Sequence, residues 1–227
     1  MTLKSVKVPQ AFSPMFKKAE VFVSEYFNLI NQDPTKGTIT IGDERYVLVR
    51  AESLSVHFLE YIRGMYPAMS EIEALAGAGT VLFDLARSIG KGDARAFFKK
   101  LDVTDPIARL SAGPIHFAYT GWAFVDILPQ SNAVPNEEYY LLYDHPFSFE
   151  ADSWIQKKEK TDFCICFMNA GYSSGWCTES FGLELKAKEI MCRARGDSAC
   201  RFIMAPPDKI DEYVKNYLAG REAVEGK

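Results

Sequence analysis

Three cysteines and one glutamate in the C-terminal third of the chain have the types and spacing of metal ligands. They are Cys166, Glu189, Cys192 and Cys200. Cys192 and Cys200 lie four residues on either side of Gly196. A hairpin that turns at Gly196 and Asp197 therefore brings their sulfur atoms face to face. Zinc accepts sulfur and oxygen ligands in a tetrahedron, and four protein ligands close its shell.

Two other interpretations of these cysteines stay open at this point. A disulfide is one, but Met1 to Gln10 contains lysines and no apolar run, which is unlike a secretory signal, and cytoplasmic thiols stay reduced. Buried, inert cysteines are the other. A regular strand also places Glu189 and Cys192 on opposite faces, so both can bind one ion only at a bulge or strand end.

A second group of residues indicates a binding site for a small molecule. Between His116 and Trp154 the chain has ten aromatic residues and two of its three histidines. Aromatic residues favour strands, so a sheet core explains many of them. A mostly apolar pocket with a few polar groups is also what a small aromatic ligand requires. The candidate ligand-binding residues are His116, His145, Phe117, Tyr119, Trp122, Phe147, Tyr172 and Trp176.

The composition is that of a globular protein. The 227 residues are 48% hydrophobic and 25% charged, which is ordinary for a chain that buries a substantial core. No apolar run approaches the roughly 18 residues of a membrane span. The net charge of −4 offers no basic face for nucleic acid. We expect a cytoplasmic protein that binds neither membrane nor nucleic acid directly.

The pattern of the chain predicts an α+β fold with a mainly antiparallel sheet packed against helices. The expected fold includes a zinc-binding hairpin near the C-terminus and an N-terminal dimerisation segment. Expected helices span residues 14–31, 53–65, 70–89, 92–101, 148–158, 162–181 and 207–218. Expected strands span residues 38–41, 46–49, 115–128, 139–145, 185–193 and 200–204, and residues 219–227 are expected to be a linker.

Glycines affect two of the expected helices, those over residues 70–89 and 92–101. Gly90 is expected to end one helix, and Asp93 to cap the next. The triplet Gly77-Ala78-Gly79 lowers helix propensity by about 2 kcal/mol, which usually indicates close packing of another element.

No pattern of catalytic residues stands out. Gly77 and Gly79 lie inside a helical pattern, so they do not form the glycine-rich turn of a dinucleotide site. Cys177 has no basic neighbour in sequence that would lower its pKa. We therefore expect no catalytic residues and a protein that is not an enzyme.

Several motifs resemble a known family. Gly171-Tyr172-Ser173-Ser174-Gly175-Trp176-Cys177, Glu189-x-x-Cys192 and Cys200-Arg201-Phe202 resemble the vinyl-4-reductase domain in its metal-binding form. Gly113-Pro114-Ile115-His116 and Ser148-Phe149-Glu150-Ala151 resemble the N-terminal sensory module of bacterial aromatic-responsive transcription activators of the XylR and DmpR type. The resemblance covers roughly residues 36–207.

The resemblance implies a structural zinc held by Cys166, Glu189, Cys192 and Cys200. It also implies that His116 hydrogen-bonds the hydroxyl of a phenolic ligand. His145 stands where the phenol sensors have a tryptophan. That substitution favours a ligand more polar or larger than phenol itself.

These observations predict a zinc-containing sensory domain that binds a small aromatic compound and signals to a transcription-regulating or other effector, in the same chain or in trans. Residues 1–50 are expected to form a dimerisation segment and residues 51–206 the ligand-binding domain. The zinc module is expected within residues 113–206, and a helix and linker in residues 207–227. The alternative is a tetrapyrrole vinyl-reductase-like enzyme or accessory protein.

Overall fold

The main sheet has five strands, in the order β1, β5, β6, β8, β7. The computed structural model describes residues 2–158 and 160–225. Strand β1 pairs with β5 in parallel, and the other neighbours are antiparallel. The strands are β1 (Val6–Lys7), β5 (Ala123–Ile127), β6 (Leu141–Ser148), β7 (Lys186–Met191) and β8 (Cys200–Ala205).

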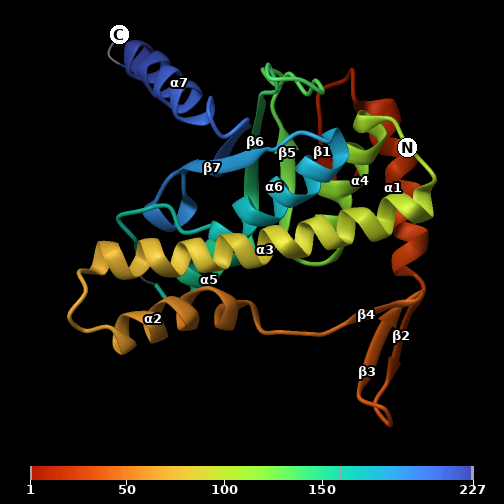
Figure 1. The fold of residues 1–227 in the computed structure, drawn as a ribbon, viewed down its shortest axis with the longest axis horizontal. Coiled ribbons are helices and arrows are strands. Elements are labelled where there is room, and N and C mark those ends of the chain that lie inside the picture. Colours follow the sequence, from red (N-terminus) through yellow and green to blue (C-terminus); the bar gives the residue numbers. More distant parts are fainter. Residues whose placement is uncertain (1, 159, 226–227) are drawn as a thin grey trace.

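Helices cover both faces of this sheet (Figure 1). Helices α4 (Pro106–Tyr119) and α6 (Phe167–Phe181) lie on the face that carries the main core, and α3 (Glu71–Leu101) packs along α6. On the other face, Ile210 and Val214 of α7 (Ile210–Glu225) pack against Leu142 and Ile203. The predicted α+β fold with a mainly antiparallel sheet is confirmed.

The N-terminal part contributes a helix and a small second sheet, seen at the lower right of Figure 1. The sheet is antiparallel, in the order β2, β3, β4. The elements are α1 (Ser13–Phe27), β2 (Ile30–Asp33), β3 (Thr38–Ile41) and β4 (Glu44–Tyr46). The remaining helices are η1 (Ala51–Leu54), α2 (Val56–Met65), α5 (Phe149–Gln156) and η2 (Arg193–Arg195).

The apolar stripe of α1 is covered within the chain. Phe16 and Val23 are fully buried, and the Tyr26 ring stacks edge-on against Phe97 of α3 at 5.1 Å. Tyr26 Oη also donates to the Ile41 carbonyl oxygen at 3.1 Å, which holds the small sheet against the helix. This stripe needs no partner molecule to bury it.

The predicted break at Gly90 is wrong, because α3 runs through it as one helix of 31 residues. A Cβ at Gly90 would lie 2.3 Å from the carbonyl oxygen of Tyr172 in α6. The glycine therefore allows the two helices to touch, and Asp93 bonds Tyr172 instead of capping a helix. Of the two glycines in the Gly77-Ala78-Gly79 triplet, Gly79 meets another element, the Phe167 ring, and Gly77 has nothing within 4 Å.

The predicted strand from Ile115 is also wrong in its first part. Asp105 caps α4 by accepting from Ala108 N at 2.8 Å, and Pro106 occupies the first turn. The helix then continues through Pro114 to Tyr119, and the strand begins only at Ala123. The apolar run that resembled a strand is the buried face of this helix.

Several elements have other bounds than expected. Helix α1 ends at Phe27 and not at residue 31, and β4 is Glu44–Tyr46, so residues 47–49, expected as strand, lie outside it. Helix α6 begins at Phe167, after the loop that carries Cys166, and not at residue 162. Helix α7 continues to Glu225, where we expected a polar linker, and residues 226–227 lie outside the described part of the chain.

Candidate functional site

The four predicted metal ligands come together from separate parts of the chain. Cys166 directly precedes α6, Glu189 lies in β7, Cys192 follows the end of β7, and Cys200 begins β8. One ligand atom from each lies within 4.8 Å of the others. The Sγ atoms of Cys166 and Cys200 are 3.6 Å apart. Ligands of tetrahedral zinc bound through sulfur are about 3.8 Å from one another.

The backbone after Glu189 explains how ligands of opposite strand parity reach one point. The pairing of β7 with β8 shifts register between Glu189 and Met191, and β7 ends at Met191. The sequence required a bulge or a strand end here, and both are present. A 3₁₀ turn follows and ends at Gly196, whose φ of +102° favours glycine. Asp197 Oδ2 accepts from Cys192 N at 2.8 Å and fixes this turn.

The donor set fits a divalent metal ion. All five cysteines are free thiols. Among the described residues, the buried Oε1 atom of Glu189 has no hydrogen-bond partner, while Oε2 accepts from Cys166 N at 2.8 Å. Burial raises the pKa of Cys166 and of Glu189 well above the usual range. A cation reverses that penalty, because it stabilises the ionised ligands.

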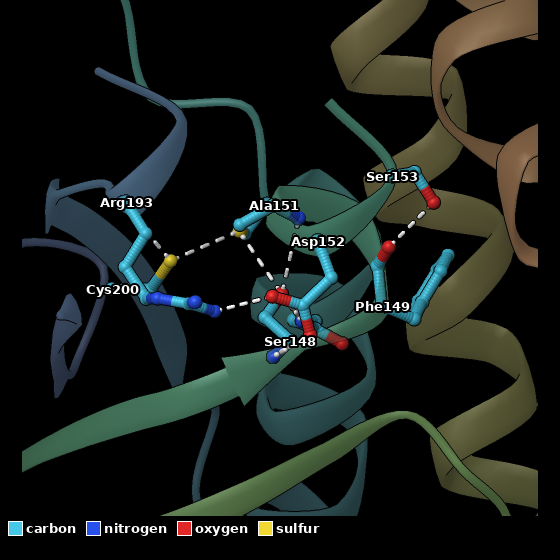
Figure 2. A network of polar contacts seen from close by, with 9 residues as sticks. Ser148, Phe149, Ala151, Asp152, Ser153, Arg193 and Cys200 are labelled. Carbon is cyan, nitrogen blue, oxygen red and sulfur yellow. Dashed lines mark hydrogen bonds and ion pairs between the residues drawn. The ribbon is translucent and has the colours of Figure 1, made fainter. Parts of the chain in front are cut away.

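Polar groups of α5 and α6 support the ligands, as Figure 2 shows around Ser148 and Cys200. Ser148 Oγ lies 3.3 Å from Cys166 Sγ and accepts from Asn169 Nδ2 at 2.7 Å. Arg193 pairs with Asp152, and its backbone N donates to Cys200 Sγ at 3.4 Å. The Ser-x-Glu-Ala motif therefore contacts the metal ligands, which the sequence had not assigned to it.

Glu150 of the same motif binds the start of α6. Its carboxylate accepts from the backbone N–H groups of Met168 and Asn169 at 3.0 and 2.9 Å. These are unsatisfied donors of a helix N-terminus, which attract negative charge. Burial outweighs this attraction and raises the pKa of Glu150 to about 8.

A small buried cavity lies between α4, α6 and the inner face of the sheet. Its volume is about 30 Å³, enough for one or two water molecules but not for an aromatic ring. Three candidate ligand residues, Phe117, Tyr172 and Trp176, line it. The other lining residues are Leu110, Gly113, Pro114, Val125, Ile127, Leu141, Tyr143, Ser173, Cys177 and Met204.

His116 lies beside this cavity and is hydrogen-bonded to one of its walls. Its Nδ1 atom is 2.9 Å from Tyr172 Oη, which also lies 2.9 Å from Asp93 Oδ2. Its ring lies against those of Phe97 and Trp176. Burial lowers the pKa of His116 to about 3, so the imidazole is neutral at physiological pH.

The order of donors in this chain of hydrogen bonds follows from charge. Burial raises the pKa of Asp93 to about 6, so the carboxyl is mostly ionised at pH 7 and accepts from Tyr172. The single hydroxyl hydrogen of Tyr172 is then used, and Nδ1–H of His116 donates to it. Nε2 of His116 consequently carries a free lone pair.

His145 is completely buried on the inner face of β6. Its ring lies 4.6 Å from that of Phe202 and 5.7 Å from that of Phe117. Neither ring nitrogen has a hydrogen-bond partner among the described residues. Burial lowers the pKa of His145 to about 3, which leaves a neutral ring with two unused polar atoms.

The remaining candidates, Tyr119, Trp122 and Phe147, line a separate groove of about 500 Å³ that is open to the surface. A bulge explains the position of Phe147. Phe124 pairs with Phe147 and Asp126 with Asp144, so Val125 faces two residues of β6. The extra residue reverses the alternation and leaves Phe147 63% exposed. Trp122 lies between the two sites, 4.9 Å from the Tyr172 ring.

Within the described residues, no helix is both long and apolar enough to cross a membrane.

Comparisons with known proteins identify the fold. No family model matches the sequence, and no curated protein matches it. Among solved structures, a trafficking protein particle complex subunit 3 from Naegleria fowleri, covalently bound to palmitic acid, matches weakly. It has a TM-score of 0.46 and 12% identity over 68% of this chain and 93% of that one.

A second solved structure matches nearly the whole chain. It is the phenol-responsive sensory domain of the transcription activator PoxR, solved with phenol. The TM-score is 0.72 and the identity 19%, over 90% of this chain and 96% of that one. The chain therefore has the fold of an aromatic-sensing domain of a transcription activator.

Proposed function

We propose that this protein is a zinc-containing sensory domain that binds a small aromatic compound and signals to a transcription-regulating or other effector. The observation that carries the proposal is the fold, which is shared over 90% of the chain with a domain solved in complex with phenol. The buried cavity supports it, because Phe117, Tyr172 and Trp176 supply aromatic walls. Such walls and a few polar groups suit a small aromatic ligand.

Ligand entry requires the cavity to expand beyond its 30 Å³. Trp176 and Phe117 are the large movable walls, and Trp122 separates them from the surface groove. A ligand shifts a conformational equilibrium only if it binds the two forms unequally. An expanded form that holds the ligand and a contracted form that excludes it satisfy this condition. The change in α4 and α6 is the signal that the effector reads.

His116 is the hydrogen-bond acceptor in this proposal. Its Nδ1 is occupied by Tyr172, and its Nε2 lone pair suits a hydroxyl donor on the ligand. A phenolic O–H fits this acceptor, whereas a phenolate does not.

Zinc has a structural role in the proposal. Cys166, Glu189, Cys192 and Cys200 provide four protein ligands, which leaves no open position for catalysis. The ion would bind the start of α6 to β7 and β8, and α6 also supplies Tyr172 and Trp176 to the cavity. Zinc binding thereby stiffens one wall of the ligand site.

The test is calorimetric titration of the protein with phenol, toluene, benzoate and cyclohexanol. We expect saturable binding of at least one aromatic compound and none of cyclohexanol. His116→Ala should weaken the binding of a phenol at least about tenfold, the value of one lost hydrogen bond. Tyr119→Ala, in the surface groove, is the matched control and should leave affinity unchanged.

Absence of binding by every aromatic compound would contradict the proposal. The tetrapyrrole-related alternative would then be examined with a tetrapyrrole in the same titration. The buried cavity, at about 30 Å³, gives that alternative no support.

A further inference from the structure

Three side chains in or next to β6 carry buried polar atoms without a partner, and one of them, Tyr143, lines the buried cavity. Tyr139 Oη, Tyr143 Oη and both ring nitrogens of His145 have no hydrogen-bond partner among the described residues. All three side chains are at most 1% exposed. Buried polar atoms in native proteins nearly always have a partner, which is a protein group, an ordered water or a bound ligand. These atoms therefore indicate that something absent from the protein chain completes this region.

Tyr143 connects this cluster to the cavity. It lines the cavity from β6, and Ser173 and Cys177 of α6 line it as well. The ring of His145 lies 5.3 Å from that of Tyr143 on the same strand face. The hydroxyl of Tyr172, in contrast, is already bonded to His116 and Asp93. The cavity thus has two polar regions. At Tyr172 the hydroxyl is bonded within the chain, and only the Nε2 lone pair of His116 is left for a ligand, whereas Tyr143 Oη has no partner among the described residues.

Charge limits what can occupy the second region. No Lys, Arg, Asp or Glu is among the residues that line the cavity. An ionised carboxylate buried there would lose its hydration without a compensating charge, which is strongly unfavourable. A neutral hydroxyl both donates and accepts, as the hydroxyl of Tyr143 does, so the two groups can bond in either direction.

Building on the proposed function, we propose that the ligand is a neutral aromatic compound with two hydroxyl groups, one for the Tyr172 and His116 region and one for Tyr143. Tyr143 is then a specificity-determining residue. A monohydric phenol satisfies only the first region and leaves Tyr143 Oη buried without a partner. Benzoates are excluded by their charge.

The test compares hydroquinone, resorcinol and catechol with phenol and benzoate, by calorimetric titration of the full zinc-loaded chain at pH 7 under nitrogen. At least one dihydric phenol should bind about tenfold or more tightly than phenol, the value of one buried hydrogen bond. Benzoate should bind most weakly. Tyr143→Phe removes one oxygen atom and should abolish the advantage while phenol affinity changes less than about threefold.

Tyr140→Phe is the matched control. Tyr140 belongs to the opposite side of the sheet, where its ring contacts Tyr213 of α7, and the substitution should leave the preference intact. Dihydric phenols that bind no more tightly than phenol would overturn this inference and leave the proposed function standing. The same holds for a preference that survives Tyr143→Phe. If no aromatic compound binds the unmodified protein, both the inference and the proposed function are wrong.

Discussion

At the scale of single residues, two hydrogen bonds decide the chemistry of His116. Asp93 accepts a hydrogen bond from Tyr172, and Tyr172 accepts one from Nδ1 of His116; both distances are 2.9 Å. The direction of these two hydrogen bonds depends on the charge of Asp93, because a protonated carboxyl would no longer require the hydroxyl hydrogen of Tyr172. The carboxylate on α3 thus sets the tautomer of a histidine on α4 through a tyrosine on α6.

The raised pKa of Asp93, about 6, makes this residue a source of pH-dependent stability. The folded protein holds the proton more tightly than the unfolded chain, so raising the pH from about 4 to 7 weakens folding. Asp93→Asn removes the loss of stability that ionisation of Asp93 causes. It should raise the unfolding free energy at pH 7 by about 1–3 kcal/mol, with no gain at pH 4. Denaturant unfolding at several pH values measures this. Asp84→Asn, exposed on the same helix, is the control for the loss of a carboxylate from α3.

The proposed metal site gives a second prediction at the residue scale. Cys192→Ser should abolish stoichiometric zinc in protein purified without added metal, and should lower the melting temperature by at least several degrees, because a site ligand is lost. Cys164→Ser is the matched control, since Cys164 is two residues from Cys166 but outside the four-ligand group. Native mass spectrometry reads the metal content. Equal zinc content in both variants would contradict the four-ligand assignment.

At the scale of elements, α3 and α6 touch backbone to backbone. A Cβ at Gly171 would lie 2.1 Å from the Phe83 carbonyl oxygen, and one at Gly175 would lie 2.2 Å from that of Arg87. Neither contact can be relieved by turning a side chain. The Gly-x-x-x-Gly spacing in α6 thus sets the distance between the helices, and with it the position of Tyr172 against Asp93.

Gly171→Ala should therefore destabilise the protein by about 2–3 kcal/mol or more, since overpacking forces the helices apart. Gly77→Ala in α3 should change stability in the opposite direction, because Gly77 is exposed and has nothing within 4 Å of the added Cβ. It should stabilise by about 0.5–1 kcal/mol through helix propensity. Thermal and denaturant unfolding measure both. Equal effects of the two substitutions would exclude the close crossing.

At the scale of the whole molecule, the two faces of the sheet have different partners. On the face opposite the cavity, Arg201 forms a double hydrogen bond with Asp144 at 2.6 and 2.7 Å and reaches Tyr217 of α7. Asp144 and Arg201 are direct neighbours in sequence of His145 and Cys200. On one face, strands β6 and β8 consequently carry residues of the cavity and of the candidate metal site. On the other face they carry the residues that contact the C-terminal helix.

We also propose a homodimer, formed through a surface other than the α1 stripe, because Phe16 and Val23 of that stripe are buried within the chain. Val47, Leu48 and Val49 are 73%, 79% and 54% exposed, a continuous apolar run between β4 and η1. Such a run usually marks an interaction surface. We expect a dimer at micromolar concentration and a shift to monomer in Leu48→Asp, measured by sedimentation. Ile155→Asp, exposed on α5, should remain dimeric, and a monomeric unmodified protein would contradict the prediction.

The sequence by itself determined the features that depend on neighbouring residues. The helical stripe of α1, the pairing of β3 with β4 and the residue types of the candidate metal ligands are all local signals. Even the need for a bulge or strand end after Glu189 followed from side-chain alternation alone. The tertiary structure decided which ligands meet, because the 4.8 Å proximity joins residues up to 34 positions apart.

Long-range packing also decided the points where local signals failed. Gly90 resembles a helix end until α6 lies against it, and Ile115 resembles a strand residue until α4 buries it in the core. The extra residue of β6 opposite Val125 turned Phe147 to the surface, although the sequence had placed Phe147 among the candidate ligand-binding residues. Whether a cavity exists beside Tyr143 depends on how three layers of side chains fit together, and no local pattern carries that information.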